Sequence, residues 1–309
     1  MHKNNFQNTE SHSIANWQTI AMMPVTVVVW AFAFPFIKIG LRELSFINLT
    51  IMRFFIASIG FIAILVIRSK KLSKLQKQDI PSIFVLGFCG VIIYHFGLNY
   101  GEQYISAGTA SLIITTIPIF IVILSYFFLK ERLTKRKTSG IFAALIGVVI
   151  ISIWGTEDSS IEIIYMFGAL TVLISAVMGA VYTVAGKKLL SRYTPLSLTM
   201  YAMLLGSVGL IPFVNTSLLE EVSTMSIDTW FAIVFLGLFS TVVGYVIWYV
   251  ALEKRDASEL SIYLYVIPVL STIISYFLFD DKITSLFIIG GLLVIAGLIL
   301  VNKETNVKK

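Results

Sequence analysis

The segment AGTASLIITTIPIFIVILSYFFLKERLT at residues 107–134 returns 150 positions later as ASELSIYLYVIPVLSTIISYFLFDDKIT at residues 257–284. Each copy is an apolar run with a central proline, then a short charged turn, then a second apolar run that contains glycines. Matched positions include Pro118 with Pro268 and Gly147 with Gly297. A repeat with a fixed period indicates a duplicated structural unit. The chain is therefore expected to consist of two related halves.

The composition is typical of a membrane protein. Hydrophobic residues make up 57% of the 309 residues and charged residues only 13%, with a mean hydropathy of +0.90. Apolar runs of roughly 18 residues or more recur, which is long enough for a helix to cross a bilayer. The net charge of +6 does not indicate nucleic acid, because the basic residues fall in short clusters between apolar runs. Cys89 is the only cysteine, so an internal disulfide is excluded.

At about 20 residues per crossing, the apolar runs predict an all-α polytopic membrane protein with about ten transmembrane helices. The predicted spans are 19–37, 46–67, 80–104, 107–129, 139–154, 163–186, 195–214, 229–252, 258–279 and 284–301. They group into a first repeat of five spans at 19–155 and a second at 163–302. Polar tails are expected at 1–18 and 303–309.

Lysine and arginine residues predict the orientation of the spans, because loops rich in them stay in the cytoplasm. Each even-numbered span is followed by a basic segment, as at residues 68–77 and 130–137, whereas acidic residues such as Glu157 and Glu220 follow odd-numbered spans. Both termini are therefore predicted to be cytoplasmic, with the spans in the cytoplasmic membrane. Because each repeat has an odd number of spans, the second must enter the membrane inverted relative to the first.

The chain resembles the drug/metabolite transporter superfamily, specifically proteins with two EamA domains. The residues that carry the resemblance are Val29–Phe34 with Lys38, Arg53, the element from Ile105 to Pro118, and Leu129–Thr134 followed by Gly140 and Gly147. The resemblance implies a secondary transporter that works by alternating access and exports a small metabolite, with amino acids among the candidates. It also implies a cavity between the halves, lined by spans one, three, four, six, eight and nine.

Candidate cavity residues follow from matching the halves and from this resemblance. At the repeat offset the third span's His95 and Asn99 match Tyr245 and Tyr249 of the eighth span, so polar and aromatic groups lie on matching helix faces. An aromatic wall would suit an amphipathic or aromatic substrate. The prolines either line the pathway or only kink their helices, with Thr115 and Thr116 repairing the bonding. The predicted set is Trp30, Phe34, Tyr94, His95, Asn99, Thr115, Pro118, Tyr182, Tyr245, Trp248, Tyr249, Tyr263, Tyr265 and Pro268.

Three residues are candidates for a charge or proton site: Arg53, His95 and Glu102. A charge as deep as Arg53 must be paired or face water, so it either forms an ion pair with Glu102 or Glu43 or binds an anion. His95 could carry protons, since its ordinary pKa of about 6.5 suits that task, or could simply bond a neighbouring helix. The repeat is not symmetric here, because Arg53 is matched by Ala202 and Trp30 by Gly179.

Charged residues outside the spans are expected to be structural. Lys38 lies at a span end, where its side chain can reach water. Glu131 and Asp281 match each other but fall on opposite membrane sides, so each is expected to serve its own turn and favour the helix that follows.

Several other functions are excluded by missing motifs. The glycines before Lys187 and Lys188 do not have the spacing of a phosphate loop, so no ATPase is expected. No metal cluster, catalytic triad or cofactor site can be assembled, and an intramembrane enzyme or a scaffold is disfavoured. The expected partners are a small-molecule substrate, membrane lipids and, in a proton-coupled mechanism, protons. A broad drug exporter or a flippase for lipid-linked substrates is the nearer alternative, and the oligomeric state stays open.

Overall fold

A computed structural model describes residues 4–68, 72–131, 134–154, 163–279 and 284–302. Every regular element within these ranges is helical, and none is a strand. Asp281 and the predicted tail at 303–309 lie outside the described residues. The prediction of an all-α membrane protein is confirmed.

The first half forms a series of long helices, some of which are broken into consecutive segments. They are α1 (Asn4–Gly40), α2 (Phe46–Arg68), η2 (Lys77–Asp79), α3 (Ile80–Gly87), η3 (Phe88–Ile93), α4 (Tyr94–Tyr104), α5 (Ala107–Ile114), α6 (Ile117–Leu124), η4 (Ser125–Leu129) and α7 (Lys135–Trp154). The break between α5 and α6 precedes Pro118, which lacks an amide hydrogen. At this break the Thr116 hydroxyl donates to the Ile113 carbonyl oxygen at 2.7 Å, and the Thr115 hydroxyl donates to that of Leu112.

The second half follows the same order. Its helices are α8 (Ile163–Leu189), α9 (Pro195–Val208), η5 (Ile211–Phe213), α10 (Thr216–Ser223), α11 (Ile227–Val234), η6 (Phe235–Val243), α12 (Gly244–Lys254), α13 (Ala257–Leu260), η7 (Ser261–Tyr265), α14 (Val266–Phe279) and α15 (Ser285–Asn302). The short helix α10 lies between the predicted spans 195–214 and 229–252 and was not predicted, because it is too short and polar to appear as an apolar run. The side chain of Asn215 caps it by accepting from the Ser217 amide at 3.0 Å.

Eight helical segments of the described chain are long and apolar enough to cross a membrane: Ala21–Gly40, Phe46–Arg68, Lys77–Tyr104, Ala107–Leu129, Met166–Leu189, Pro195–Phe213, Ile227–Lys254 and Ala257–Leu278. They correspond to eight of the ten predicted spans. The other two predictions fall on α7 and α15, of which only Ile288–Gly297 stands out as a shorter apolar helix. Large apolar side chains such as Phe127, Phe167 and Leu292 are exposed, as on a surface that lies against lipid.

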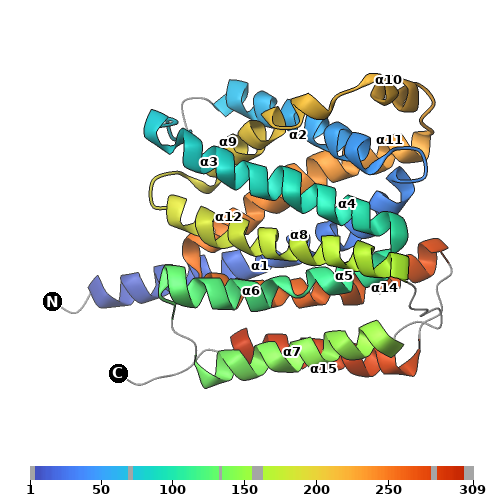
Figure 1. Cartoon of the computed structure of the whole chain (residues 1–309). Helices are drawn as coiled ribbons and strands as arrows, with labels where there is room; N and C mark the ends of the chain where they lie inside the picture. Colours follow the sequence, from blue (N-terminus) through green and yellow to red (C-terminus); the bar gives the residue numbers. More distant parts are fainter. Residues whose placement is uncertain (1–3, 69–71, 132–133, 155–162, 280–283, 303–309) are drawn as a thin grey trace.

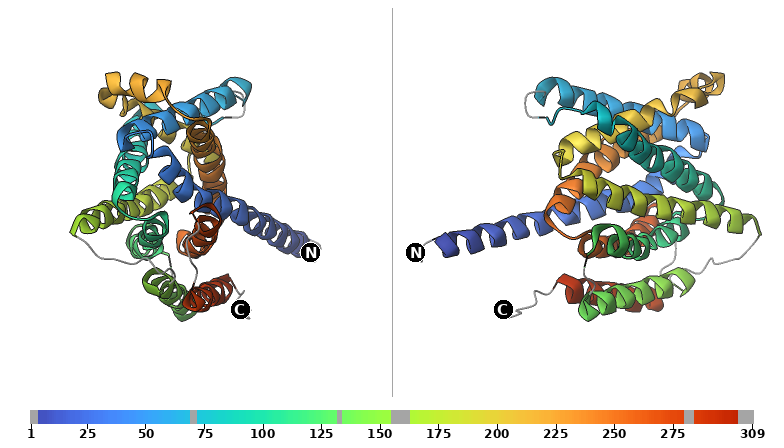
Figure 2. Two further views of the ribbon diagram at one scale, coloured as in Figure 1. Left: turned by 90° about the vertical axis from the view of Figure 1, so that its right-hand side faces the viewer. Right: turned by 60° about the vertical axis from the view of Figure 1, so that its left-hand side comes forward.

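The helices lie roughly side by side (Figure 1), and α8 reaches the outer edge of the bundle in both views of Figure 2. Helix α1 packs against α12 and α14, and α4 packs against α8, so the two halves interleave. Helices α7 and α15 form a separate pair at one edge, which both views of Figure 2 also show. The start of α1 and the end of α15 lie at the same end of the bundle (Figure 1). This end is called the basic end below, because Lys187, Lys254 and Arg255 lie there.

Candidate functional site

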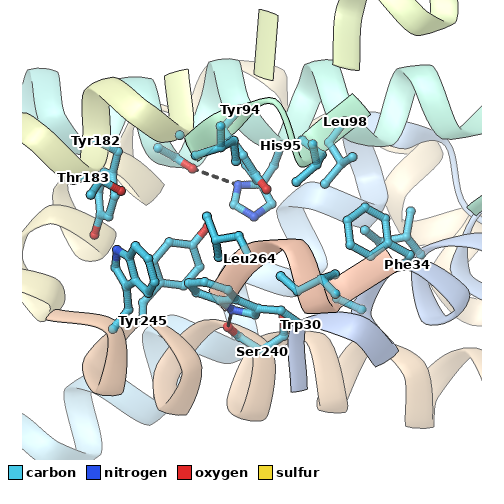
Figure 3. A pocket seen from close by; sticks show the side chains of 18 of the residues that line it. Trp30, Phe34, Tyr94, His95, Leu98, Tyr182, Thr183, Ser240, Tyr245 and Leu264 are labelled. Carbon is cyan, nitrogen blue, oxygen red and sulfur yellow. Dashed lines mark hydrogen bonds between the residues drawn. The ribbon is translucent and has the colours of Figure 1, made fainter. Parts of the chain in front are cut away.

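A narrow chamber lies in the middle of the bundle and is lined by both halves. Its volume, counted as the space that the centres of water molecules can occupy, is about 70 Å³. The lining residues are Trp30, Ala33, Phe34, Ile37, Arg53, Gly90, Tyr94, His95, Leu98, Ile114, Ile117, Gly179, Tyr182, Thr183, Ser240, Tyr245, Trp248, Leu264 and Ile267. Figure 3 shows most of them from close by.

Aromatic rings form one wall of this chamber. The ring centre of Trp30 lies 5.3 Å from that of Tyr245 and 5.5 Å from that of Trp248, and Tyr182 meets Tyr245 edge-on at 5.6 Å. Gly179 stands where the repeat matches Trp30, and a side chain there would press on Tyr94 and Ile117. The asymmetry of the repeat at this position therefore makes room for the chamber.

Two matched π-helical turns give the chamber its backbone acceptors. Segment η3 in the first half and η6 in the second are both π-helices, whose wider turns are frequent at functional sites. The carbonyl oxygen of Gly90 lies 2.9 Å from Nδ1 of His95, and the carbonyl oxygen of Ser240 accepts the Trp30 indole N–H at 3.0 Å (Figure 3). Gly90 and Ser240 are equivalent at the repeat offset of 150, so the duplication places one such acceptor in each half.

Arg53 brings a cation into the chamber from α2. Its side chain is buried, and the guanidinium donates from Nε to the Thr241 hydroxyl at 2.9 Å and from Nη2 to the Ser240 hydroxyl at 3.2 Å. Within the described part of the chain, no carboxylate lies within ion-pair distance of it. The expected ion pair with Glu102 or Glu43 is thus not formed in this structure.

Toward the basic end, the chamber is closed by a pair of tyrosines. The Tyr249 hydroxyl donates to the Tyr182 carbonyl oxygen at 3.0 Å, and the two rings lie 5.3 Å apart. Gly186 packs directly against the Tyr249 hydroxyl, where a β-carbon would overlap it. These three residues, Tyr182, Gly186 and Tyr249, are called the floor.

Beyond the floor, Glu131 ties the two halves together at the basic end. Its carboxylate accepts from the amides of Ala257 and Ser258 at 2.8 and 3.1 Å, and from the Ser258 hydroxyl at 2.7 Å. The ammonium of Lys187 lies 3.5 Å away. The sequence had assigned Glu131 to its own turn, which is wrong because the carboxylate caps α13 in the other half. Thr134 caps the following helix α7 instead. Glu131, Lys187, Ala257 and Ser258 are called the latch.

At the opposite end, a wider vestibule opens between the helix ends. Its volume by the same measure is about 570 Å³, and its lining includes Lys38, Arg42, Glu102, Gln103 and Ser106. Lys38 is half-buried and donates to the carbonyl oxygen of Glu102, so it is less solvated than its span-end position suggested. The carboxylate of Glu102 is fully buried and has no hydrogen-bond partner among the described residues. Glu102 lies one helical turn from Leu98 of the chamber.

The structure separates the predicted site residues into two groups. Trp30, Phe34, Arg53, Tyr94, His95, Tyr182, Tyr245 and Trp248 line the chamber, whereas Asn99, Thr115, Pro118, Tyr249, Tyr263, Tyr265 and Pro268 are not in its lining. Asn99 donates to the Thr50 hydroxyl at 2.9 Å, and Glu102 lies in the vestibule. Sequence reasoning missed Thr183 and Ser240. The only sequence signal for Ser240 is its match with Gly90, which lies in the third span together with the polar residues His95 and Asn99.

Comparison with known proteins gives this architecture a family. Residues 17–153 and 166–303 each match the EamA-like transporter family. An uncharacterized transporter of Archaeoglobus fulgidus is 42% identical over 92% of this chain and 98% of its own length. A probable terminal-alkyne amino-acid exporter of Streptantibioticus cattleyicolor is 33% identical over 91% and 92% of the two chains. A probable amino-acid metabolite efflux pump of Escherichia coli is 26% identical over 89% and 91%.

One solved structure, titled only as a protein crystal structure, has the same fold with a TM-score of 0.72. It is 19% identical and covers 92% of this chain and 96% of its own. Two matched domains, full-length transporter relatives and the membrane-length helices all agree. The chain therefore belongs to the EamA-like transporter family and is a multi-pass membrane transporter.

Proposed function

We propose that this protein is a secondary transporter that exports a small metabolite, such as an amino acid, by alternating access. The observation that carries the proposal is a chamber between the two halves that is closed at one end by the floor and the latch. The other end faces the vestibule. In alternating access the site opens to one side of the membrane at a time, and inverted repeats provide the two opposed states.

The charges around the latch support the direction in which the chamber faces. Lys137, Lys187, Lys254 and Arg255 lie at this end, and Lys137 forms ion pairs with Asp256 and Glu259 at 3.0 and 2.9 Å. Basic helix ends stay in the cytoplasm. The latch is then cytoplasmic, as are both termini, and the vestibule faces outward from the cytoplasmic membrane. Repeats at 19–155 and 163–302 are the two bodies that would rock against each other.

The names of the relatives support amino acids as a substrate class to test first. Two of them are described as an amino-acid exporter and an amino-acid metabolite efflux pump. The chamber's aromatic rings favour a substrate with an apolar body, which they can cover from several sides. The chamber must widen around such a substrate, because its present volume of about 70 Å³ is well below the roughly 300–1,000 Å³ of typical ligand pockets.

Proton coupling through Glu102 is part of the proposal. A fully buried carboxylate without a hydrogen-bond donor is costly as an anion, so it would bind a proton when buried and release it when water or a cation arrives. Lys38, which already donates to the backbone oxygen of the same residue, is the nearby cation that could favour release. Nδ1 of His95 is held by the Gly90 carbonyl oxygen, and Nε2, which has no partner among the described residues, is free to take a proton. The positive charge of Arg53 in the same lining disfavours a second cation there, which makes His95 the weaker candidate.

The test is transport by the purified protein in proteoliposomes, with a panel of metabolites and with or without a pH gradient. Gradient-dependent uptake of at least one metabolite is expected, and it should be lost in Glu102→Gln but retained in His95→Ala. If transport is equal with and without the gradient, proton coupling is refuted. If no metabolite on the panel moves under any gradient, the metabolite-export proposal itself fails.

An apolar groove on the side of the bundle favours a second candidate function. Ile113 and Thr116 face Met166, Phe167, Leu170 and Leu173 of α8 across this groove, which is almost entirely apolar. It could admit a lipid-soluble drug or a lipid-linked substrate from the membrane. Competition separates the candidates: organic cations or amphipathic lipids should inhibit uptake of the transported metabolite only if the drug-exporter or flippase function is correct.

A further inference from the structure

Among the described residues that line the chamber, Arg53 is the only lysine or arginine, and no aspartate or glutamate joins it there. The guanidinium has five N–H donors, and its hydrogen bonds to Thr241 and Ser240 use two of them. Both acceptors are neutral hydroxyls, so the positive charge is not neutralised by a carboxylate in contact with it. Glu102, the nearest acidic group on the facing helix, belongs to the vestibule.

A buried cation without a contacting anion is costly, and proteins keep such groups in membranes mainly where they bind something. Arg53 cannot be explained by the repeat, because the matched position in the second half is Ala202. Its hydroxyl partners fix the guanidinium beside Ser240, whose carbonyl oxygen holds the Trp30 indole. Ser240 therefore contacts both the Arg53 guanidinium and Trp30 of the aromatic wall.

We infer that the chamber binds a monoanionic organic acid, with its carboxylate on Arg53 and its apolar or aromatic body against Trp30, Tyr245 and Trp248. This inference rests on the proposed transport function and specifies its substrate class. Guanidinium and carboxylate match in geometry and form strong, charge-assisted hydrogen bonds. The rings supply the apolar contact on the other side.

The same geometry discriminates against a free ammonium group. The lining offers no carboxylate to pair with one, and Arg53 repels a cation. A zwitterionic amino acid would have to place its ammonium against neutral groups, such as the Tyr182 hydroxyl or His95 Nε2, which lack partners among the described residues, with no anion in the lining to neutralise it. An amino acid whose nitrogen is acylated, or a carboxylic acid with no nitrogen, is therefore the preferred ligand.

The test uses probes that share one phenyl ring and one short chain but differ in charge: 3-phenylpropanoate, its neutral amide, N-acetylphenylalanine, phenylalanine and phenethylamine. Binding to the purified wild-type protein is measured by calorimetry. The two anions are expected to bind at least about tenfold more tightly than the amide and phenylalanine, and phenethylamine is expected to be weakest. Equal affinity for the acid and its amide, tighter binding of phenylalanine, or binding of none of the probes overturns the inference.

Variants then assign the preference to Arg53. In Arg53→Gln, the affinity for 3-phenylpropanoate should fall about tenfold or more while that for the amide stays the same, and Arg53→Lys should keep a smaller preference for the acid. Lys254→Gln, which removes an exposed positive charge at the basic end, is the matched charge control and should leave the preference intact. An unchanged preference in Arg53→Gln overturns the assignment. If these probes fail but another metabolite is transported, only the substrate class is wrong and the proposed function stands.

Discussion

Gly186 has no side chain, which leaves room for the Tyr249 hydroxyl to reach the Tyr182 carbonyl oxygen and close the chamber. An alanine there would overlap the Tyr249 hydroxyl and lie 2.6 Å from its ring carbon Cζ, so Tyr249 would have to leave the Tyr182 carbonyl oxygen. Gly186→Ala is expected to lower the free energy of unfolding by about 1–3 kcal/mol, the usual cost of overpacking. Thermal unfolding in detergent measures it. Gly108→Ala, whose β-carbon would meet only Ser106 at an ordinary 3.7 Å, is the control. An equal loss of unfolding free energy in Gly186→Ala and Gly108→Ala would contradict the close contact between Gly186 and Tyr249 in the floor.

Glu43 provides a pH-dependent contact at the vestibule end of the bundle. Its carboxylate accepts from the amide of Ser226 at 2.8 Å, and the hydrogen bonds from the Ser226 amide and hydroxyl hold the pKa of Glu43 below its usual value. A carboxyl group with a lowered pKa stabilises the folded state above its unfolded pKa of about 4.3, and this stability is lost as the pH falls through the folded pKa.

Wild type should therefore unfold at a higher temperature than Glu43→Gln at pH 7, and the difference should shrink toward zero as the pH is lowered below about 4. Differential scanning fluorimetry across pH measures both proteins. Glu220→Gln, which removes an exposed carboxylate at the same end, should track wild type at every pH. A difference between wild type and Glu43→Gln that stays constant with pH would rule out this contact as the cause.

Helices α7 and α15 depend on backbone contact. A β-carbon at Gly147 would overlap the carbonyl oxygen of Gly290 and lie 2.9 Å from the Val294 amide, and backbone atoms cannot rotate away. Gly147→Ala should therefore separate the two helices and lower the unfolding temperature. The matched control is Gly291→Ala on α15, where the β-carbon would lie 3.7 Å from Val269 and the better helix propensity of alanine applies. If Gly147→Ala is as stable as this control, the pair is not closely packed in the membrane.

The elements also show what sequence could predict. Long apolar runs located the membrane helices, because burial in lipid demands about 20 apolar residues whatever the neighbours are. The family resemblance, which supplied the lining spans, and the match of His95 with Tyr245 together found most aromatic residues of the chamber, including Trp30, Tyr182 and Tyr245. The π-helical turns, α10 and the role of Ser240 were missed. A single inserted residue in a helix, a short amphipathic turn and an acceptor on the backbone leave no periodic signal.

At the scale of the whole molecule, the proposed outward-facing state depends on the latch. Glu131→Gln removes the charge that the Ala257 and Ser258 amides and Lys187 share, which should weaken the latch by about 1–3 kcal/mol. A two-state equilibrium between outward-open and inward-open forms then shifts toward the inward-open form by about tenfold for each 1.4 kcal/mol.

Thiol labelling measures this shift from the side of the membrane on which the floor and the latch close the chamber. In a Cys89→Ser background, Thr183→Cys places a reporter in the chamber beside the floor, and a membrane-impermeant maleimide in inside-out vesicles reaches it only in the inward-open form. Glu131→Gln should raise the labelling rate about fivefold to a hundredfold. It should also slow the labelling of Gln103→Cys in the vestibule from outside. Glu220→Gln removes an equal charge far from the latch, so it should change neither labelling rate. Equal labelling rates in Glu131→Gln and its parent would show that Glu131 does not hold the halves together.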